Sequence, residues 1–217
     1  MFVYIYNIHL WKYQLIYGGV DMNDREWDKR LHIRTIGRED ESSADCSPYE
    51  PTPYAVLQRL ADSGHVRRKS RVLDYGCGKG RVAFFLAAAV GCRVTGIDHS
   101  PKLIDIARAN RSASGLGDRV RLVCCPAERY EPEDEDVFFF FNPFSQRVFD
   151  SVLRRLRRSW QDSPRALRVV CYYPSEEYLR CLEALPEAAL LDDIDCGDLF
   201  NGRNPRERIV VYGFPPG

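Results

Sequence analysis

A glycine-rich turn directly after a short apolar run constrains the fold of this chain most strongly. The run is Arg71–Tyr75, and Gly76, Gly78 and Gly80 follow it at two-residue spacing. Glycines at a strand-to-helix junction let the backbone approach a ligand without a Cβ atom in the way. In open α/β sheets, ligands bind beyond the carboxyl ends of the strands. The pattern therefore predicts a buried strand, a ligand-binding loop and a following helix.

The chain after residue 71 alternates short apolar runs with amphipathic segments. Strands are expected at 71–75, 92–97, 120–124, 136–141, 166–172, 190–194 and 208–212, with helices at 81–90, 101–112, 146–160 and 175–184. The continuous aromatic run in the fourth strand implies burial on both faces, as a central parallel strand requires. The last two strands leave no room for a helix between them and form a hairpin. We therefore expect an α/β, Rossmann-like doubly wound sheet with helices on both faces.

One domain is expected, because 217 residues suffice for one three-layer core and are few for two. The domain is predicted to span residues 49–217, after an N-terminal arm and flexible loop at 1–48. Residues 1–18 are apolar but interrupted by polar side chains, which makes them too polar for a membrane span. Residues 1–21 are either an extra packing element or a non-native extension, since Met22 opens a chain of ordinary soluble character.

Charge and cysteine content exclude several classes of protein. Lys plus Arg and Asp plus Glu are both 31, so no global attraction to nucleic acid or anionic lipid is evident. The eight cysteines fall mostly in predicted strands and helices and form no C-x-x-C pair. This usage is typical of reduced cysteines in a cytoplasmic protein. The four histidines do not supply the spacing of a zinc site, and no metal is predicted.

Two acidic residues near the glycine turn indicate the chemistry of its ligand. The third glycine comes too early for the G-x-G-x-x-G fingerprint, which argues against a pyrophosphate and a nicotinamide dinucleotide. Asp74 precedes the glycines, where a carboxylate suits a ligand with an ammonium group. Asp98 closes the next strand, where an acid can accept both ribose hydroxyls. Together they predict a nucleoside that carries an amino-acid tail.

On these residues the sequence resembles the class I S-adenosylmethionine-dependent methyltransferases, over about residues 49–214. The resemblance implies six parallel strands plus one antiparallel strand, and S-adenosyl-L-methionine as the cofactor. It assigns cofactor binding to Asp74, Tyr75, Gly76, Cys77, Gly78, Gly80 and Asp98. The family usually has an acid after the third strand that meets the adenine amino group, but Pro126 stands there in this chain. Glu128 is the available substitute, or else a solvated carboxylate at a helix start.

The segment Asn142-Pro143-Phe144 follows the fourth strand and emerges at the same sheet edge as the glycines. It looks like an abbreviated Asn/Asp-Pro-Pro-Tyr/Phe motif of amino-directed methyltransferases. That resemblance implies that the Asn142 side chain and a following carbonyl hold the target amino group, while Phe144 stacks on the target or shields the cation. These three residues are the candidate catalytic residues. In the alternative interpretation, Asn142 caps the next helix and Pro143 lies in its first turn.

The segment Tyr49–Tyr54 is similar to the (Phe/Tyr)-x-Thr-Pro segment of several amino-directed methyltransferases. The similarity implies that Thr52 meets the cofactor carboxylate and that Tyr49 or Tyr54 covers the methionyl end. In the alternative interpretation, Thr52 is an N-cap and Pro53 the first helical residue.

Five arginines lie in the helix expected after the fourth strand, at positions 147, 154, 155, 157 and 158. Such a run is usually a solvated face, and no aromatic side chains are interleaved with it as in a single-strand nucleic-acid site. The sequence therefore predicts a methyltransferase that acts on a nitrogen of a small molecule or protein, with no membrane partner. A non-catalytic S-adenosylmethionine-binding module and a nucleic-acid base methyltransferase stay open as alternatives, because this fold serves many acceptors.

Overall fold

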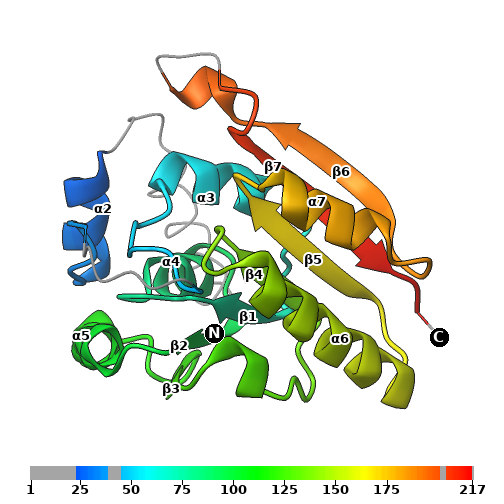
Figure 1. Cartoon of the computed structure of the whole chain (residues 1–217). Coiled ribbons are helices and arrows are strands. Elements are labelled where there is room, and N and C mark those ends of the chain that lie inside the picture. Colours follow the sequence, from blue (N-terminus) through cyan, green and yellow to red (C-terminus); the bar gives the residue numbers. More distant parts are fainter. Residues whose placement is uncertain (1–22, 39–44, 201–203, 217) are drawn as a thin grey trace, which may run out of the picture.

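A seven-stranded sheet in the order β3-β2-β1-β4-β5-β7-β6 forms the centre of the domain in the computed structural model, which describes residues 23–38, 45–200 and 204–216 (Figure 1). The strands are β1 Arg71–Tyr75, β2 Arg93–Asp98, β3 Val120–Cys124, β4 Val137–Phe140, β5 Leu167–Tyr172, β6 Ala189–Asp195 and β7 Arg208–Phe214. Only β7 runs antiparallel to its neighbours, so six strands point one way and β7 the other. The predicted six-plus-one sheet is confirmed.

Helices cover both faces of the sheet. They are α2 Asp24–Leu31, α3 Tyr54–Asp62, α4 Arg81–Ala89, α5 Pro101–Ser114, α6 Gln146–Asp162 and α7 Glu176–Glu183, with the short 3₁₀ turns η1 Ala127–Arg129 and η2 Gly197–Leu199. The apolar sides of α2, α3 and α4 form one core with one face, and those of α6 and α7 form a second core with the other. Side chains of β4 alternate between the cores: Phe139 faces the first, and Phe138 and Phe140 face the second. Its aromatic run is therefore buried on both sides, as expected.

The connection between β6 and β7 differs from the expected bare hairpin. It contains η2, whose backbone is closed by Leu199 N–H donating to the Cys196 carbonyl at 3.0 Å. The two strands still pair directly, with β6 at the sheet edge and β7 inserted between β6 and β5. The prediction was wrong about the connection because a single 3₁₀ turn needs only three residues and has no apolar period.

The N-terminal arm contributes a helix to the first core. Trp27 of α2 is buried against Tyr54 and Phe85, with ring centroids 5.5 and 5.2 Å apart. Asn23 and Glu26 close the start of α2 as a capping box, a pattern that sequence alone could have shown. The expected loop at 38–47 lies largely outside the described residues, and so do residues 1–21. None of the described helices is long and apolar enough to cross a membrane.

Candidate functional site

A cavity of about 1000 Å³ opens at the carboxyl ends of the central parallel strands. The glycine turn, the end of β2, the segment 45–53, η1 and the ends of β4 and β5 all contribute to its wall. Most of the predicted site residues line it, namely Tyr49, Thr52, Asp74, Tyr75, Gly76, Cys77, Asp98, Glu128, Asn142, Pro143 and Phe144. Among the predicted residues, Gly78 and Gly80 do not line the cavity. The structure thus brings three separate sequence motifs to one place.

Two glycines of the turn are packed so closely that side chains cannot replace their hydrogens. Gly76 has φ +72°, and a Cβ atom there would lie 2.4 Å from Cβ of Pro143. Gly78 has φ +52°, and a Cβ atom would lie 2.2 Å from Cε2 of Tyr49. Both values are far inside van der Waals contact, and both φ values favour glycine. The glycines therefore let Tyr49 and Pro143 pack onto the turn and enclose the cavity.

Tyr49, one of the two tyrosines predicted to cover the methionyl end of the cofactor, packs over the glycine turn. Its ring lies over Gly78, its hydroxyl donates to the Thr35 carbonyl at 2.7 Å, and Lys79 Nζ is 4.8 Å from its ring centroid. Tyr54, the other candidate, lies in the α2 core, where its hydroxyl donates to Asp28 Oδ1 at 2.7 Å. Tyr54 was therefore the wrong candidate, because α2 supplies the apolar partner that its ring needs.

Thr52 is buried at the cavity wall but does not cap α3. The N-cap position belongs to Pro53, with no side-chain capping bond. The N-cap interpretation of Thr52 is therefore wrong. Its carbonyl oxygen instead accepts a hydrogen bond from Arg81 Nη1 at 3.2 Å.

Asp74 is a buried carboxyl group that lacks a hydrogen-bond donor and so favours a positively charged ligand. It is 2% exposed, and its Oδ2 atom is buried without a hydrogen-bond partner. Burial, with a smaller contribution from the Asp98 charge, raises the pKa of the Asp74 carboxyl to about 8. A buried carboxylate without a donor is costly. An ammonium group in the cavity would supply both the charge and the donor that are missing.

Asp98 is held in place by the backbone on both sides. Its Oδ2 accepts from Gly78 N–H and its Oδ1 accepts from Ser100 N–H, each at 2.9 Å. Because an ionised carboxylate has about four lone-pair sites, two remain for hydroxyl donors. With Asp74 and the closely packed glycines, the site therefore fits a nucleoside with an amino-acid tail.

The next stretch of wall comes from η1. Pro126, Ala127 and Glu128 line the cavity, and Cys125 N–H donates to the Asp98 carbonyl at 2.9 Å, which ties this loop to β2. Glu128 is half-buried and lies in the first turn of η1. Its position is compatible with both interpretations from the sequence, because a helix-start carboxylate here also faces the cavity wall.

Two residues of the turn have their side chains committed to the core. The Tyr75 ring stacks on Phe140, with centroids 4.8 Å apart and planes at 9°. Cys77 is buried, and its Sγ atom lies 3.0 Å from where a Cβ atom of Gly96 would be. Burial raises the pKa of the Cys77 thiol well above its usual range, so the sulfur stays protonated.

Gly80 is the N-cap residue of α4, with φ +89°.

Asn142 connects the ends of β4 and β5. Its Nδ2 donates to the Tyr173 carbonyl at 2.6 Å, and its Oδ1 accepts from Ser175 N–H at 3.2 Å. The N-cap of α6 is Ser145, so the prediction that Asn142 caps this helix is wrong. Asn142 adopts a left-handed conformation, φ 40°, that directs its amide to β5 instead.

The main chain of the Asn-Pro pair is also bonded within the protein. Ser47 Oγ donates to the Asn142 carbonyl at 2.7 Å, and Ser47 N–H donates to the Pro143 carbonyl at 3.1 Å. A target amino group would therefore have to use a second lone pair of these oxygens.

Phe144 lies at the cavity wall but is packed as a core residue. It is 8% exposed, and its ring contacts Tyr75, Phe140, Phe149 and Tyr178 at centroid distances of 6.0 to 6.5 Å. Its carbonyl accepts from the Tyr178 hydroxyl at 2.7 Å. The expected stacking on a target is therefore not supported by the position of this ring.

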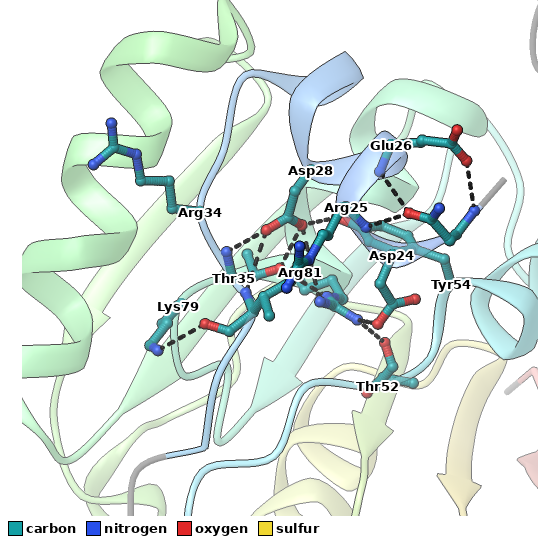
Figure 2. Close-up of polar contacts among 12 residues, drawn as sticks. Asp24, Arg25, Glu26, Asp28, Arg34, Thr35, Thr52, Tyr54, Lys79 and Arg81 are labelled. Carbon is teal, nitrogen blue, oxygen red and sulfur yellow. Dashed lines mark hydrogen bonds and ion pairs between the residues drawn. The ribbon is translucent and has the colours of Figure 1, made fainter.

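A buried polar cluster, missed in the sequence, joins the helix after the glycine turn to the N-terminal arm (Figure 2). Arg81 is 2% exposed; its Nε donates to Thr35 Oγ1 at 2.7 Å, and its Nη1 pairs with Asp24. Asp28 accepts from Thr35 N–H and Thr35 Oγ1, both at 2.6 Å. The guanidinium also lies 4.4 Å from the Tyr54 ring centroid. This cluster fixes the strand-to-helix turn against α2.

Sequence analysis also missed the aromatic end of the cavity. Phe141, Tyr172, Tyr173, Phe200 and Glu207 line it, at the ends of β4 and β5, at η2 and just before β7. For Phe141, Tyr172 and Tyr173 a signal was available in their position at the carboxyl ends of β4 and β5, whereas Phe200 and Glu207 lie in the connection before β7 and had no such signal. The described residues include no group of three or more His, Cys, Asp or Glu side chains that could hold a metal ion.

Comparison with known proteins shows which proteins this chain is similar to. Residues 72–163 match the model of a methyltransferase domain. The chain is 42% identical over 70 residues to the release factor glutamine methyltransferase of Chlorobaculum tepidum, covering 31% of this chain and 24% of that protein. It is 34% identical over 100 residues to the 27-O-demethylrifamycin SV methyltransferase of Amycolatopsis mediterranei, covering 46% and 35%. The chain thus spans a quarter to a third of the length of these two relatives.

A solved structure shares the fold over most of both chains. It is the RNA methyltransferase of Salinibacter ruber in complex with S-adenosyl-L-homocysteine, with a TM-score of 0.54 and 21% identity. The likeness covers 76% of this chain and 92% of that one. The three similar proteins are named for a protein, a small-molecule and an RNA acceptor.

Proposed function

We propose that this chain, a member of the class I S-adenosylmethionine-dependent methyltransferase family, transfers a methyl group from S-adenosyl-L-methionine to a nitrogen of a small molecule or protein. The buried Oδ2 of Asp74, which lacks a partner beside the glycine turn, carries this proposal. This oxygen atom requires a positively charged donor such as an ammonium group. Nearby, Asp98 has lone pairs left for ribose hydroxyls. A nucleotide diphosphate would place negative charge against Asp74 and is disfavoured.

Each part of the cofactor would be held by a different element. Asp74 holds the ammonium group, Asp98 the ribose and Glu128 the adenine, while Tyr49 and Thr52 enclose the methionyl end. When bound, S-adenosyl-L-methionine supplies an electrophilic methyl group on its sulfonium. The chain excludes water there through Tyr49, which packs on Gly78, and Pro143, which packs on Gly76.

Asn142 and Pro143 act on the acceptor by position. Their oxygens can each offer a remaining lone pair to an N–H of the acceptor and so orient its nitrogen. Orientation of this kind lowers a barrier without a strong base. Asn142 also fixes the turn at Tyr173, so its side chain supports the acceptor wall.

A small molecule or a protein side chain is the favoured acceptor. Of the arginines on α6, Arg147, Arg155 and Arg157 pair with Asp45, Glu131 and Glu187 of the same chain. Their charge is therefore largely satisfied within the protein, which weakens the case for a nucleic-acid surface. All eight cysteines are free thiols, which supports a reducing compartment such as the cytoplasm.

Calorimetry tests the cofactor assignment. The wild type is expected to bind S-adenosyl-L-homocysteine, and Asp98→Ala to lose that binding. Asp74→Asn should weaken S-adenosyl-L-homocysteine but leave 5′-methylthioadenosine, which lacks the amino-acid tail, within about threefold of the wild type. A wild type that binds neither ligand would refute the proposal.

A labelling experiment tests the transfer step and the alternatives. Cell extract is divided into RNA, protein and metabolite fractions, and each is incubated with the enzyme and methyl-labelled S-adenosyl-L-methionine. Label in protein or metabolites, lost with Asn142→Ala, supports the proposal. Label in RNA would identify a nucleic-acid methyltransferase. No label from a protein that binds the cofactor would identify a non-catalytic binding module.

A further inference from the structure

The cavity continues past the glycine turn to a wall made mostly of aromatic rings. We call the residues Phe141, Tyr172, Tyr173, Phe200 and Glu207 the aromatic subsite; all line the cavity. Three of the rings contact one another. The centroid of the Phe141 ring lies 4.7 Å from that of Tyr172 and 6.4 Å from that of Tyr173, and the centroids of the two tyrosine rings are 6.1 Å apart. Their planes differ by 47° to 82°, so they meet as tilted walls rather than as one stack.

Glu207 supplies a carboxylate to this subsite. The Tyr172 hydroxyl donates to Glu207 Oε2 at 2.6 Å. Burial, and then this bond to Glu207, raises the pKa of Tyr172 above its usual range. The phenol therefore stays a neutral donor to the Glu207 carboxyl group. Because a carboxylate can accept about four hydrogen bonds, this one bond leaves most of its capacity for a ligand.

The turn at Tyr173 is held firmly in place. Tyr173 has φ 52°, a left-handed conformation that is unfavourable for a non-glycine residue and is found most often at functional sites. Asn142 Nδ2 and Arg206 Nη2 both donate to its carbonyl, at 2.6 and 3.2 Å. Asn204 Nδ2 donates to its hydroxyl at 2.7 Å. The ring is thus preorganised before any ligand arrives.

One cation already contacts this ring. The Arg206 guanidinium lies 4.2 Å from the Tyr173 centroid, and it also donates to the carbonyls of Pro174 and Tyr173. Arg206 is not among the described residues that line the cavity. Arg206 therefore contacts the Tyr173 ring without lining the cavity. Glu207 is the charged side chain among the five residues of the subsite.

The subsite lies where an acceptor would approach. In the sheet, β1 carries Asp74, β2 with Asp98 lies on one side of it, and β4 and β5 lie on the other. If Asp98 and η1 hold the nucleoside, the amino-acid tail at Asp74 separates the nucleoside from the aromatic subsite. The subsite therefore lies on the side of the methionyl part of the cofactor, whose sulfonium carries the methyl group. This placement rests on the proposed function.

We propose that the aromatic subsite binds an organic ammonium group, so that the acceptor carries a cationic group near neutral pH in addition to the uncharged nitrogen that receives the methyl group. Aromatic faces attract a cation through their quadrupoles, and the attraction grows when the cation is removed from water. The Glu207 carboxylate, which lines the same wall, adds a charge of opposite sign. A neutral ligand of the same shape gains neither the attraction to the rings nor the attraction to Glu207.

The test compares choline with its uncharged isostere 3,3-dimethylbutan-1-ol. Binding is followed by NMR titration of the complete chain saturated with S-adenosyl-L-homocysteine. Choline should bind at least about tenfold more tightly than the isostere. Glu207→Gln keeps an acceptor for the Tyr172 hydroxyl and removes the charge, so it should reduce this preference to within about threefold.

Glu50→Gln is the matched control, since Glu50 lines the same cavity, is exposed and does not belong to the aromatic subsite. It should keep the choline preference. Equal binding of choline and the isostere by the wild type, or a preference that survives Glu207→Gln, would overturn the inference. So would failure to bind choline by a protein that binds S-adenosyl-L-homocysteine normally. Failure to bind S-adenosyl-L-homocysteine would overturn the proposed function instead.

Discussion

The Asn142 side chain donates from Nδ2 to the Tyr173 carbonyl at 2.6 Å, and both residues have left-handed backbones, with φ 40° and 52°. Two strained residues at the ends of adjacent parallel strands are thus joined by one hydrogen bond. Such strain persists only where surrounding contacts over-determine it. The bond couples the Asn-Pro segment, which packs on the glycine turn, to the ring wall of the aromatic subsite.

Removing the Asn142 amide should lower stability and methyl transfer together. Asn142→Ala loses both side-chain bonds and keeps a Cβ atom in the left-handed region, and we expect it to cost roughly 2–3 kcal/mol. Asn142→Gly loses the same bonds but relieves the backbone, so it should be about 1 kcal/mol more stable than the alanine variant. Urea unfolding measures both values. Equal stability of the two variants would show that the left-handed backbone is not strained.

The packing of Tyr49 on Gly78 predicts a coupled pair of substitutions. Gly78→Ala places a methyl group 2.2 Å from the Tyr49 ring and should displace that ring from the turn. S-adenosyl-L-homocysteine affinity should fall by about tenfold or more. Calorimetry with Tyr49→Ala and with the double variant gives the coupling energy. The double variant should bind better than the sum of the single losses predicts; strict additivity would contradict the contact.

The raised pKa of Asp74 predicts a stability that depends on pH in the unliganded protein. The folded pKa of about 8 exceeds the ordinary carboxyl value of 3.8, so the folded state binds more protons between these values. Stability should therefore fall as pH rises from 6 to 8, by at most about 1.4 kcal/mol per pH unit from this group. The Asp74→Asn variant should lack this slope. A wild type with the slope of the variant would contradict the raised pKa.

The same shift predicts that cofactor binding releases a proton. An ammonium group beside Asp74 favours its ionised form, so S-adenosyl-L-homocysteine affinity should rise with pH up to about 8, by as much as about tenfold per unit. Binding of 5′-methylthioadenosine, which has no ammonium group, is the internal control and should not follow this trend. Calorimetry in buffers of different ionisation enthalpy counts the released proton directly.

The Arg81 cluster predicts unequal roles for its two acids (Figure 2). Asp28 is 6% exposed and accepts from Thr35 and Tyr54, so Asp28→Ala should cost roughly 3–5 kcal/mol by leaving these buried donors without their acceptor and removing one of the two acids beside Arg81. The Asp24 side chain is 46% exposed, and Asp24→Ala should cost about 1 kcal/mol or less. Denaturant unfolding compares the two. Equal losses would contradict the unequal roles of the two acids.

The sequence by itself determined the sheet and the part of the cavity wall that the glycine turn, Asp74 and Asp98 form. The apolar periods gave the strands, because a strand buried on both faces must be apolar throughout, as in β4. The glycines, Asp74 and Asp98 were found because their chemistry depends on local spacing at the ends of two strands. Those parts of the site are encoded over a few consecutive residues.

Only the tertiary structure decided the rest. The contacts of Asn142 with Tyr173, of Tyr49 with Thr35 and of Arg81 with Asp28 join elements distant in sequence, and no local pattern encodes them. The capping expectation for Asn142 was wrong because its left-handed backbone directs the amide across to β5. Likewise, Phe144 was assigned to the target although neighbouring rings bury it. Packing between elements chooses the partner of each side chain, and that choice exists only once the sheet has assembled.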